Sequence, residues 1–470
     1  MRKQGLLMIG LGVMIGLLVT SCTWLQPASL GPLDYDPLCT IELVVSDELT
    51  DAVVAELESY GRICGRIDAI SGVVMKVNES AIPALAGLPF VRQIGSPAER
   101  FVHDYIDGIS TWDLDLINVT DLGIPRVTPY DGTGVYVAVL DTGLVENWRD
   151  YLPEDRIAVE YAKAFNSGQS ENTAVADVPH LWERDTASHG THVTSTILGY
   201  WIKSLTEPYA VNGVAPMATV IPVKVLSNAG SGWSPGIAAG IVYIADLKLE
   251  LDAPMVINMS LGGPELSSLE AAAIDYALAN GVVIVASAGN EAEAGMGYPG
   301  AYEPVISVGS VGWVDEWIAA GWWRLDVPEL LVPSDVVELI YVSDFSSREL
   351  AGQDLDVLAP GSWVIGPYLG SGAATPQLWS NGTPGEYYYL GGTSMASPHV
   401  AGLVALMFDK NPNLVATEVE GILENAAIAL PAGSKWVDDG SGVLVEYVWG
   451  LDATGAGLLL ADLVLSAIDP

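Results

Sequence analysis

Cysteine is scarce in this sequence: Cys22, Cys39 and Cys64 are the three present, and all lie near the N-terminus. The long stretch after Cys64 therefore contains neither a disulfide framework nor a zinc site built from cysteine thiolates. Cys39 and Cys64 could form one disulfide or remain as two free thiols, and the sequence leaves both alternatives open.

Basic residues are also few, with 19 Lys and Arg against 58 Asp and Glu, which gives a formal net charge of −39. A nucleic-acid partner is excluded, because phosphate backbones are bound by clustered Lys and Arg. Acidity of this size favours a solvated surface, cationic partners and a salty or calcium-rich medium. Half of the residues are hydrophobic, so the chain can bury a large core.

Histidine is the third rare residue type, and the five present are His103, His180, His189, His192 and His399. His189 and His192 are spaced so that both could bind one metal ion from the same helix. However, no HExxH arrangement and no nearby cysteine accompanies them, which argues against a zinc site.

The first 21 residues have the layout of a signal peptide: Arg2 and Lys3 precede an apolar run from Gly5 to Leu18. The following Val19-Thr20-Ser21-Cys22 resembles a bacterial lipobox, which implies cleavage before Cys22 and lipid attachment to its sulfur. Alternatives are an ordinary signal peptide or an uncleaved anchor. Residues 22–37 then form a tether, and the protein is exported, either to the cell surface or outer membrane as a lipoprotein or as a secreted product.

Residues 38–105 have the pattern of a small α+β domain. Alternating or apolar runs predict strands over 40–45, 62–70, 72–77 and 91–94, and helical spacing predicts helices over 47–60 and 78–88. The resulting order, β-α-β-β-α-β, is typical of a ferredoxin-like split unit.

From residue 134 onward, strands alternate with helices. Continuous Val and Ile runs predict buried strands over 135–140, 218–226, 255–260, 282–287 and 305–311. Helices are predicted over 190–198, 234–247, 265–280 and 394–409. This alternation predicts an α/β fold with a doubly wound, mostly parallel sheet.

Three short segments carry candidate chemistry. Asp141 ends a buried strand before a Gly turn, and the carboxyl ends of parallel strands are where sites are built. His189 opens a helix. Ser394 follows Gly391-Gly392-Thr393 at another helix N-terminus, where free N–H groups stabilise negative charge. Taken alone, each has an ordinary structural explanation, such as a turn-capping Asp or a Ser N-cap.

Together, Asp141-Thr-Gly, His189-Gly-Thr-His and Gly-Thr-Ser394-Met-Ala-Ser-Pro resemble the signature blocks of the subtilisin-like serine peptidases, in that family's order. The resemblance implies that residues 106–470 form a peptidase domain acting on proteins or peptides without a cofactor for the chemistry. Ser394 is then the nucleophile, His189 the general base and Asp141 its orienting acid. The block containing Asn290 resembles the family's oxyanion-hole segment.

The same resemblance assigns substrate-binding segments. Two stretches resemble the strands that clamp a substrate backbone by β-augmentation, and they consist of Gly230, Ser231 and Gly232, and of Ser260, Leu261 and Gly262. Gly297 resembles the floor of the S1 pocket and leaves room for a large apolar P1 side chain.

Residues 38–105 resemble the family's inhibitory propeptide, so the chain's own propeptide is an expected partner. A large aromatic residue suits a Gly-floored S1 pocket, so we expect autocleavage between Tyr105 and Ile106.

A structural calcium ion is a further expectation from the resemblance, with Asp150 and Glu207 as its candidate ligands. Calcium requires six to eight oxygen ligands, and a surface acid is the alternative explanation for Asp150.

A long segment from Trp313 to Tyr341 is rich in tryptophan. It includes Trp317, Trp322 and Trp323. It could form a contact surface, but a local satellite core is the interpretation we favour.

Two rival functions remain. Gly232-Trp-Ser234-Pro-Gly236 matches the Gly-x-Ser-x-Gly pattern of lipases and esterases. There, however, the residue after the nucleophile donates its backbone N–H to the oxyanion, and Pro235 has none. The second rival is a catalytically inactive subtilisin-like scaffold, which the intact catalytic positions disfavour.

Overall fold

The computed structural model describes residues 38–46, 49–68, 71–95, 108–122, 126–166, 176–178, 180–202, 209–319, 321–328, 336, 338–369 and 386–468. The chain divides into two compact units, Met1–Val102 and His103–Pro470. Within the described residues, no helix combines the length and apolar character needed to cross a membrane.

The N-terminal unit has one four-stranded antiparallel sheet in the order β2-β3-β1-β4. Alternate residues of β1, namely Ile41, Leu43 and Val45, are buried against the helices, as the period of two requires. The order of elements confirms the predicted split unit, and its members are β1 (Leu38–Val45), α1 (Asp51–Glu58), β2 (Gly61–Ile67), β3 (Gly72–Asn78), η2 (Glu79–Ala81), α2 (Ile82–Ala86) and β4 (Val91–Gly95).

Cys64 is a free, exposed thiol. It lies on β2, whereas Cys39 lies on β1, and β3 runs between these two strands. Two strand spacings are about 10 Å, which is beyond the Cα separation that a disulfide spans. Of the two alternatives for Cys39 and Cys64, the disulfide is therefore wrong.

The C-terminal unit is built on a nine-stranded sheet in the order β14-β13-β12-β11-β5-β10-β6-β7, with β15 also paired to β13. Neighbouring strands are parallel except for the pairs β13–β14 and β6–β7. The strands are β5 (Tyr136–Asp141), β6 (Lys163–Asn166), β7 (Ala176–Asp177), β10 (Thr219–Lys224), β11 (Met255–Met259), β12 (Val282–Ser287), β13 (Ile306–Trp313), β14 (Ile340–Val342) and β15 (Val357–Pro360).

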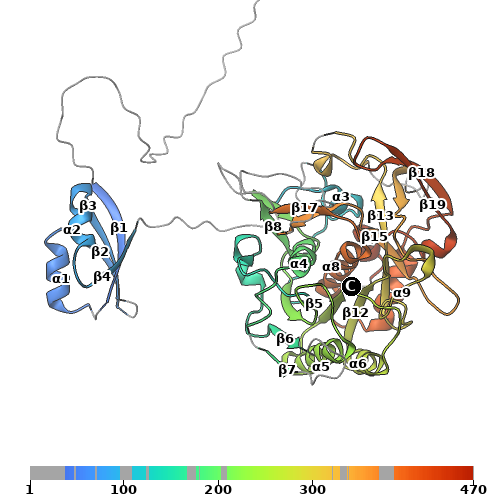
Figure 1. Cartoon of the computed structure of the whole chain (residues 1–470), viewed down its shortest axis with the longest axis horizontal. Coiled ribbons are helices and arrows are strands. Elements are labelled where there is room, and N and C mark those ends of the chain that lie inside the picture. The colour runs from blue at the N-terminus through green and yellow to red at the C-terminus, as the bar shows by residue number, and fades with distance from the viewer. Residues whose placement is uncertain are drawn as a thin grey trace, which may run out of the picture. The chain divides into compact units, whose positions relative to one another are not determined.

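Helices cover both faces of this sheet, which confirms the predicted doubly wound α/β fold. Figure 1 shows α5 (Ser234–Leu251) and α6 (Ser268–Ala279) together along one face, and α4 (His189–Leu198) and α8 (Thr393–Lys410) along the other. Successive residues of β5 pack into two different cores: Val139 lies in the core with α4 and α8, and Leu140 in the core with α5 and α6. After β5, the chain forms β6, β7 and β10 on one side of this strand and then crosses to β11 on the other side. The carboxyl end of β5 is therefore a topological switch point, where α/β sheets place their sites.

The remaining elements pack around this sandwich. Three two-stranded hairpins are formed by β8 (Gly199–Ile202) with β9 (Tyr209–Asn212), β16 (Val364–Pro367) with β17 (Tyr387–Leu390), and β18 (Gly433–Asp438) with β19 (Leu444–Trp449). The other helical elements are α3 (Trp112–Leu116), η4 (Trp148–Asp150), η5 (Glu154–Arg156), η6 (Ala292–Ala294), η7 (Trp322–Arg324), α9 (Ala416–Ala426), η8 (Leu451–Ala453) and α10 (Ala461–Ser466).

The tryptophan-rich segment packs inward. Trp313, Trp322 and Trp323 are buried in the main core of the C-terminal unit, and Trp317 packs against that core. The ring of Trp322 lies 5.2 Å from that of Trp317 and 6.0 Å from that of Trp112, measured between centroids. The favoured packing interpretation holds, but the cluster is part of the main core instead of a satellite.

Candidate active site

Asp141 and His189 are in direct contact although they come from different elements. Asp141 ends β5 and is fully buried, and His189 begins α4 with its side chain 27% exposed. His189 Nδ1 lies 2.9 Å from both carboxylate oxygens of Asp141. Because a carboxylate accepts, this contact places the ring hydrogen on Nδ1 and leaves Nε2 able to accept a proton.

A hydrogen-bond network that we did not predict from the sequence holds this pair in place. The backbone N–H of Thr142 donates to Asp141 Oδ1 (2.6 Å), and the Thr142 hydroxyl donates to Asp185 (2.7 Å). The same hydroxyl accepts the N–H of Gly190 at the start of α4 (3.0 Å). Asp185 stands four residues before His189 in the sequence, but no sequence pattern predicts its contact with Thr142.

Electrostatics separate the two histidines of α4. Burial opposes charging of His189, but the charge of Asp141 and its hydrogen bonds outweigh that effect and raise the pKa of His189. His192 is fully buried, and burial lowers its pKa to about 3. Its Nε2 lies 3.1 Å from the carbonyl oxygen of Val364, so Nε2 carries the hydrogen of a neutral ring. His192 is a packed structural residue, and His189 is suited to proton transfer.

Ser394 lies in the first turn of α8, two residues after Gly392. Its hydroxyl donates to the carbonyl oxygen of Ser260 (3.2 Å), and the Ser260 hydroxyl donates back to the carbonyl oxygen of Ser394 (2.7 Å). Ser394 and His189 both line one cleft of about 1020 Å³. Among the described residues, the Ser394 hydroxyl is hydrogen-bonded to Ser260 and not to His189. In other enzymes such contacts are often long before substrate binds, and they tighten in the complex.

Asn290 is held so that its amide N–H groups remain available. Its Oδ1 accepts from both the backbone N–H (2.9 Å) and the hydroxyl (3.0 Å) of Thr393. A Cβ atom placed on Gly392 would lie 3.6 Å from Asn290 Nδ2 and 3.7 Å from the Ser394 backbone nitrogen. Both donors therefore border the same small space beside the nucleophile, which is the arrangement an oxyanion requires.

The predicted clamp segments lie in the same cleft as the nucleophile. Its lining includes all six expected residues, Gly230, Ser231, Gly232, Ser260, Leu261 and Gly262. Gly297 lies behind this surface: a Cβ atom there would be 3.5 Å from the carbonyl oxygen of Gly263 and 3.7 Å from Cα of Gly262. A side chain on Gly297 would thus fill space next to the second segment.

The expected calcium ligands are not brought together by the described residues. Asp150 ends η4 and accepts a hydrogen bond from Asn147 (3.1 Å), whereas Glu207 lies outside the described residues. The prediction of a calcium ion at this place stays a prediction. Cys22, Tyr105 and Ile106 also lie outside the described residues.

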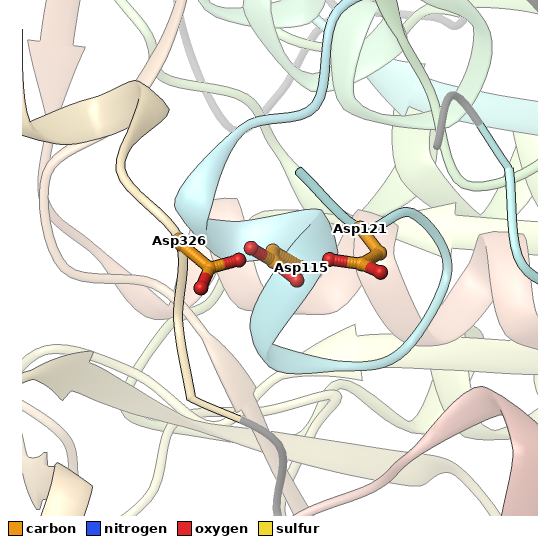
Figure 2. A group of neighbouring side chains, drawn as sticks. All are labelled: Asp115, Asp121 and Asp326. Carbon is orange, nitrogen blue, oxygen red and sulfur yellow. The ribbon is translucent and has the colours of Figure 1, made fainter. Parts of the chain in front are cut away.

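Among the described residues, three carboxylates converge at a different place. Figure 2 shows Asp115 of α3 between Asp121 and Asp326, with carboxylate oxygens within 4.8 Å of one another. Asp115 also accepts the N–H of Val327 (3.0 Å). Acidic groups can gather without an ion, and we assign no metal to this cluster.

A second histidine–aspartate contact lies behind the nucleophile and was also missed. His399 Nδ1 lies 2.8 Å from the carbonyl oxygen of Met395, and its Nε2 lies 3.0 Å from Asp113 of α3. Both side chains are buried. The two residues are 286 positions apart, and no local pattern links them.

Comparison with known proteins agrees with this geometry. A model described as the subtilase family matches residues 132–450, which is most of the chain. Subtilisin DY from Bacillus licheniformis is 34% identical over 305 residues, covering 64% of this chain and 86% of the relative. Subtilisin E from Bacillus subtilis is 29% identical over 379 residues, covering 79% of this chain and 80% of the relative.

Solved structures show the same fold. The S41 psychrophilic protease superposes with a TM-score of 0.53 at 28% identity, covering 75% of this chain and 98% of its own. Sphericase superposes with a TM-score of 0.52, also at 28% identity, covering 74% of this chain and 97% of its own. From the family match and these relatives, we conclude that the chain belongs to the subtilase family of serine peptidases.

Proposed function

We propose that the C-terminal unit is a serine endopeptidase with Ser394 as nucleophile, His189 as general base, Asp141 as orienting acid and Asn290 as oxyanion donor. The observation that carries this proposal is the contact of His189 Nδ1 with both oxygens of Asp141, in the same cleft as Ser394. Family membership supports the reaction class, and the geometry supports the individual roles.

In the acylation half, Ser394 Oγ attacks the carbonyl carbon of the scissile peptide bond. Its proton passes to Nε2 of His189, and Asp141 stabilises the resulting imidazolium through the Nδ1 hydrogen. The carbonyl oxygen becomes an oxyanion that accepts from Asn290 Nδ2 and the Ser394 N–H. Collapse breaks the C–N bond, and His189 gives its proton to the leaving amine.

In the deacylation half, water takes the place of the amine. His189 Nε2 removes a proton from water as its oxygen attacks the acyl-enzyme, and then returns that proton to Ser394 Oγ. All the groups invoked are side chains or backbone groups of this chain, so the chemistry needs no cofactor from outside. The two clamp segments hold an extended substrate backbone beside these groups.

The precursor is proposed to be exported, with residues 38–105 acting as an inhibitory propeptide and cleavage following Tyr105. Support comes from the signal-like N-terminus, the compact split unit over β1 to β4 and the family membership. Lipid on Cys22 would anchor the precursor, and more than one acyl chain is needed for a stable anchor. Cleavage after Tyr105 would separate this anchor from the catalytic unit.

A fluorophosphonate probe tests the enzyme assignment directly. We expect one adduct, on Ser394, that is lost in Ser394→Ala and strongly slowed in His189→Ala. A chain that hydrolyses no protein and forms no adduct would instead be the inactive scaffold.

N-terminal sequencing of the mature form tests the processing site. A first residue other than Ile106 refutes the proposed cleavage and leaves the enzyme assignment intact.

A further inference from the structure

A second cavity, separate from the catalytic cleft, borders the loop that carries the nucleophile. Its volume is about 410 Å³, and it shares no lining residue with the cleft. Leu390 and Gly391, which immediately precede Gly392, form one of its walls. A Cβ atom on Gly391 would lie 3.4 Å from the ring of Phe345, which also lines the cavity.

The cavity lies where the part of a substrate that follows the scissile bond can reach it. Both clamp segments lie in the catalytic cleft and take up the acyl side of the peptide. The leaving-group side must therefore extend past Ser394, away from the clamps. Gly391 and Ser394 are three positions apart, a span of at most roughly 11 Å, so the second or third residue after the scissile bond can reach the cavity.

Aromatic rings form most of the remaining walls. Tyr341 and Tyr447 lie with ring centroids 4.4 Å apart, and Trp363 and Tyr389 complete this side. Tyr447 belongs to β19, so the hairpin of β18 and β19 closes the cavity from outside the sheet. The tip of this hairpin is held in place by Trp317, which lies against Gly440.

The charges at this cavity are negative. Asp344 and Asp439 are among its lining residues, which include no Lys or Arg among the described residues. The hydroxyl and backbone N–H of Ser441 donate to Asp439 and lower its pKa, so this group stays ionised. Burial raises the pKa of Tyr447 to about 12, and the charge of Asp344 contributes to the same shift.

Other charged residues lie near the cavity but outside its lining. Burial raises the pKa of Glu316 to about 8, so this acid is neutral at pH 7 and leaves the negative charge to Asp344 and Asp439. Arg348 donates to the carbonyl oxygen of Val448, and Arg324 is placed over the ring of Trp323. Neither contact neutralises the cation, and Lys435 lies opposite Tyr447 across the hairpin. None of these three residues lines the cavity, whereas Asp344 and Asp439 do.

We propose that this cavity is a specificity pocket for a Lys or Arg side chain located two or three residues after the scissile bond. Ring faces attract a cation, and their apolar surface accommodates the aliphatic stem of either side chain. Asp344 and Asp439 supply the opposite charge at the mouth. The inference rests on the proposed peptidase function and adds a substrate class to it.

Internally quenched peptides with a constant sequence before the scissile bond test the proposal. The second and third positions after the bond carry Lys, Arg, Ala, Leu or Glu in turn. We expect kcat/KM for Lys or Arg to exceed that for Ala by about tenfold, with Glu poorest. In the double variant D344N/D439N the advantage should shrink to about twofold, while the Ala peptide is cleaved as before.

Glu446→Gln is the matched control, because Glu446 lies on the same hairpin and is paired with Ser434 on its exposed strand (3.0 Å). It should leave the preference unchanged. Equal rates for Lys and Ala in the unaltered chain overturn the proposal. A preference for Leu, or a Lys preference that stays near tenfold in D344N/D439N, also overturns it.

A binding measurement separates this proposal from the peptidase assignment. In Ser394→Ala, fluorescence anisotropy of labelled peptides should show about tenfold tighter binding of the Lys peptide than of the Ala peptide. That difference should shrink to about twofold in Ser394→Ala combined with D344N/D439N. Equal affinities refute the pocket even if cleavage occurs, whereas absent cleavage with a retained Lys advantage refutes only the peptidase assignment.

Discussion

Replacing Asp113 by Ala should destabilise the C-terminal unit, because Asp113 joins α3 to α8, the helix that begins beside Ser394. Its carboxylate lies 3.0 Å from His399 Nε2, and both side chains are buried. The carbonyl oxygen of Met395 can only accept, so His399 Nδ1 must donate to it. A second proton must then lie between Nε2 and the carboxylate.

The size of the effect follows from what the substitution leaves behind. Asp113→Ala removes the partner and leaves a buried ring nitrogen with no hydrogen bond, for which a loss of about 3–5 kcal/mol is expected. Asp113→Asn should cost less, about 1–2 kcal/mol, because its amide can donate to Nε2 of the neutral ring. At roughly 2 cal/mol/K of unfolding entropy per residue, the larger loss lowers Tm by about 5 °C for a unit of this length.

Differential scanning calorimetry of chains carrying Ser394→Ala measures this without interference from autolysis. Asp462→Ala is the matched control, since Asp462 also accepts a long-range hydrogen bond, from Asn118 (2.9 Å), but at an exposed position. It should lower Tm by less than about 1 °C. If Asp113→Ala unfolds at the same temperature as Asp462→Ala, the reasoning about the buried pair is wrong.

Three further predictions concern the catalytic groups. Burial opposes charging of His189, but Asp141 outweighs it and raises the pKa of His189 above its ordinary value of 6.5. Because the base must be neutral to act, the acidic limb of the kcat/KM profile should have its midpoint above pH 6.5. Asp141→Asn should move this limb to lower pH while reducing kcat by about 10⁴-fold. Asn290→Ala should lower kcat by about 10²–10³-fold with little change in KM, which is the size of the effect known for the equivalent donor of subtilisin. Steady-state assays that show a change confined to KM would contradict the oxyanion role. Gly297→Val should slow cleavage after Phe or Tyr by at least about tenfold while sparing cleavage after Ala, since a lost fit of this kind is worth 1–3 kcal/mol; equal effects on both peptides would remove Gly297 from the S1 pocket.

The sequence predicted those elements whose determinants are local. The runs of Val and Ile over 255–260 and 282–287 correspond to β11 and β12 within one residue. The helix that carries the nucleophile was predicted over 394–409 and observed as α8, Thr393–Lys410. Boundaries differed mainly where a cap decides them: the predicted helix over 47–60 begins only at Asp51, because Thr50 caps it by accepting from the N–H of Val53.

Contacts between distant segments could not be predicted in the same way. Asp113 and Asp185 are unremarkable acids in the sequence, and their importance depends on which backbone groups and rings the fold brings to them. The motif around His189 identified the candidate general base, but not the Thr142 hydroxyl that ties its helix to Asp185. Motifs therefore identified the candidate catalytic residues, and the three-dimensional structure was needed to find the groups that hold them.

The acidity of the chain has two separable effects on basic substrates, and salt distinguishes them. A net charge of −39 attracts cationic peptides at long range and accelerates their encounter with any part of the surface. At physiological ionic strength, charges more than about 8 Å apart are largely screened. Contact between a Lys side chain and the rings and carboxylates of the proposed pocket is shorter than this and should largely survive.

Raising the salt concentration should thus lower kcat/KM for all basic peptides, wherever their Lys residues lie. The ratio between peptides with Lys and Ala at the pocket position should change little, provided the comparison peptide carries its Lys elsewhere. If this ratio falls to about one already at 0.15 M salt, where the screening length is about 8 Å, the preference comes from the general field and not from Asp344 and Asp439.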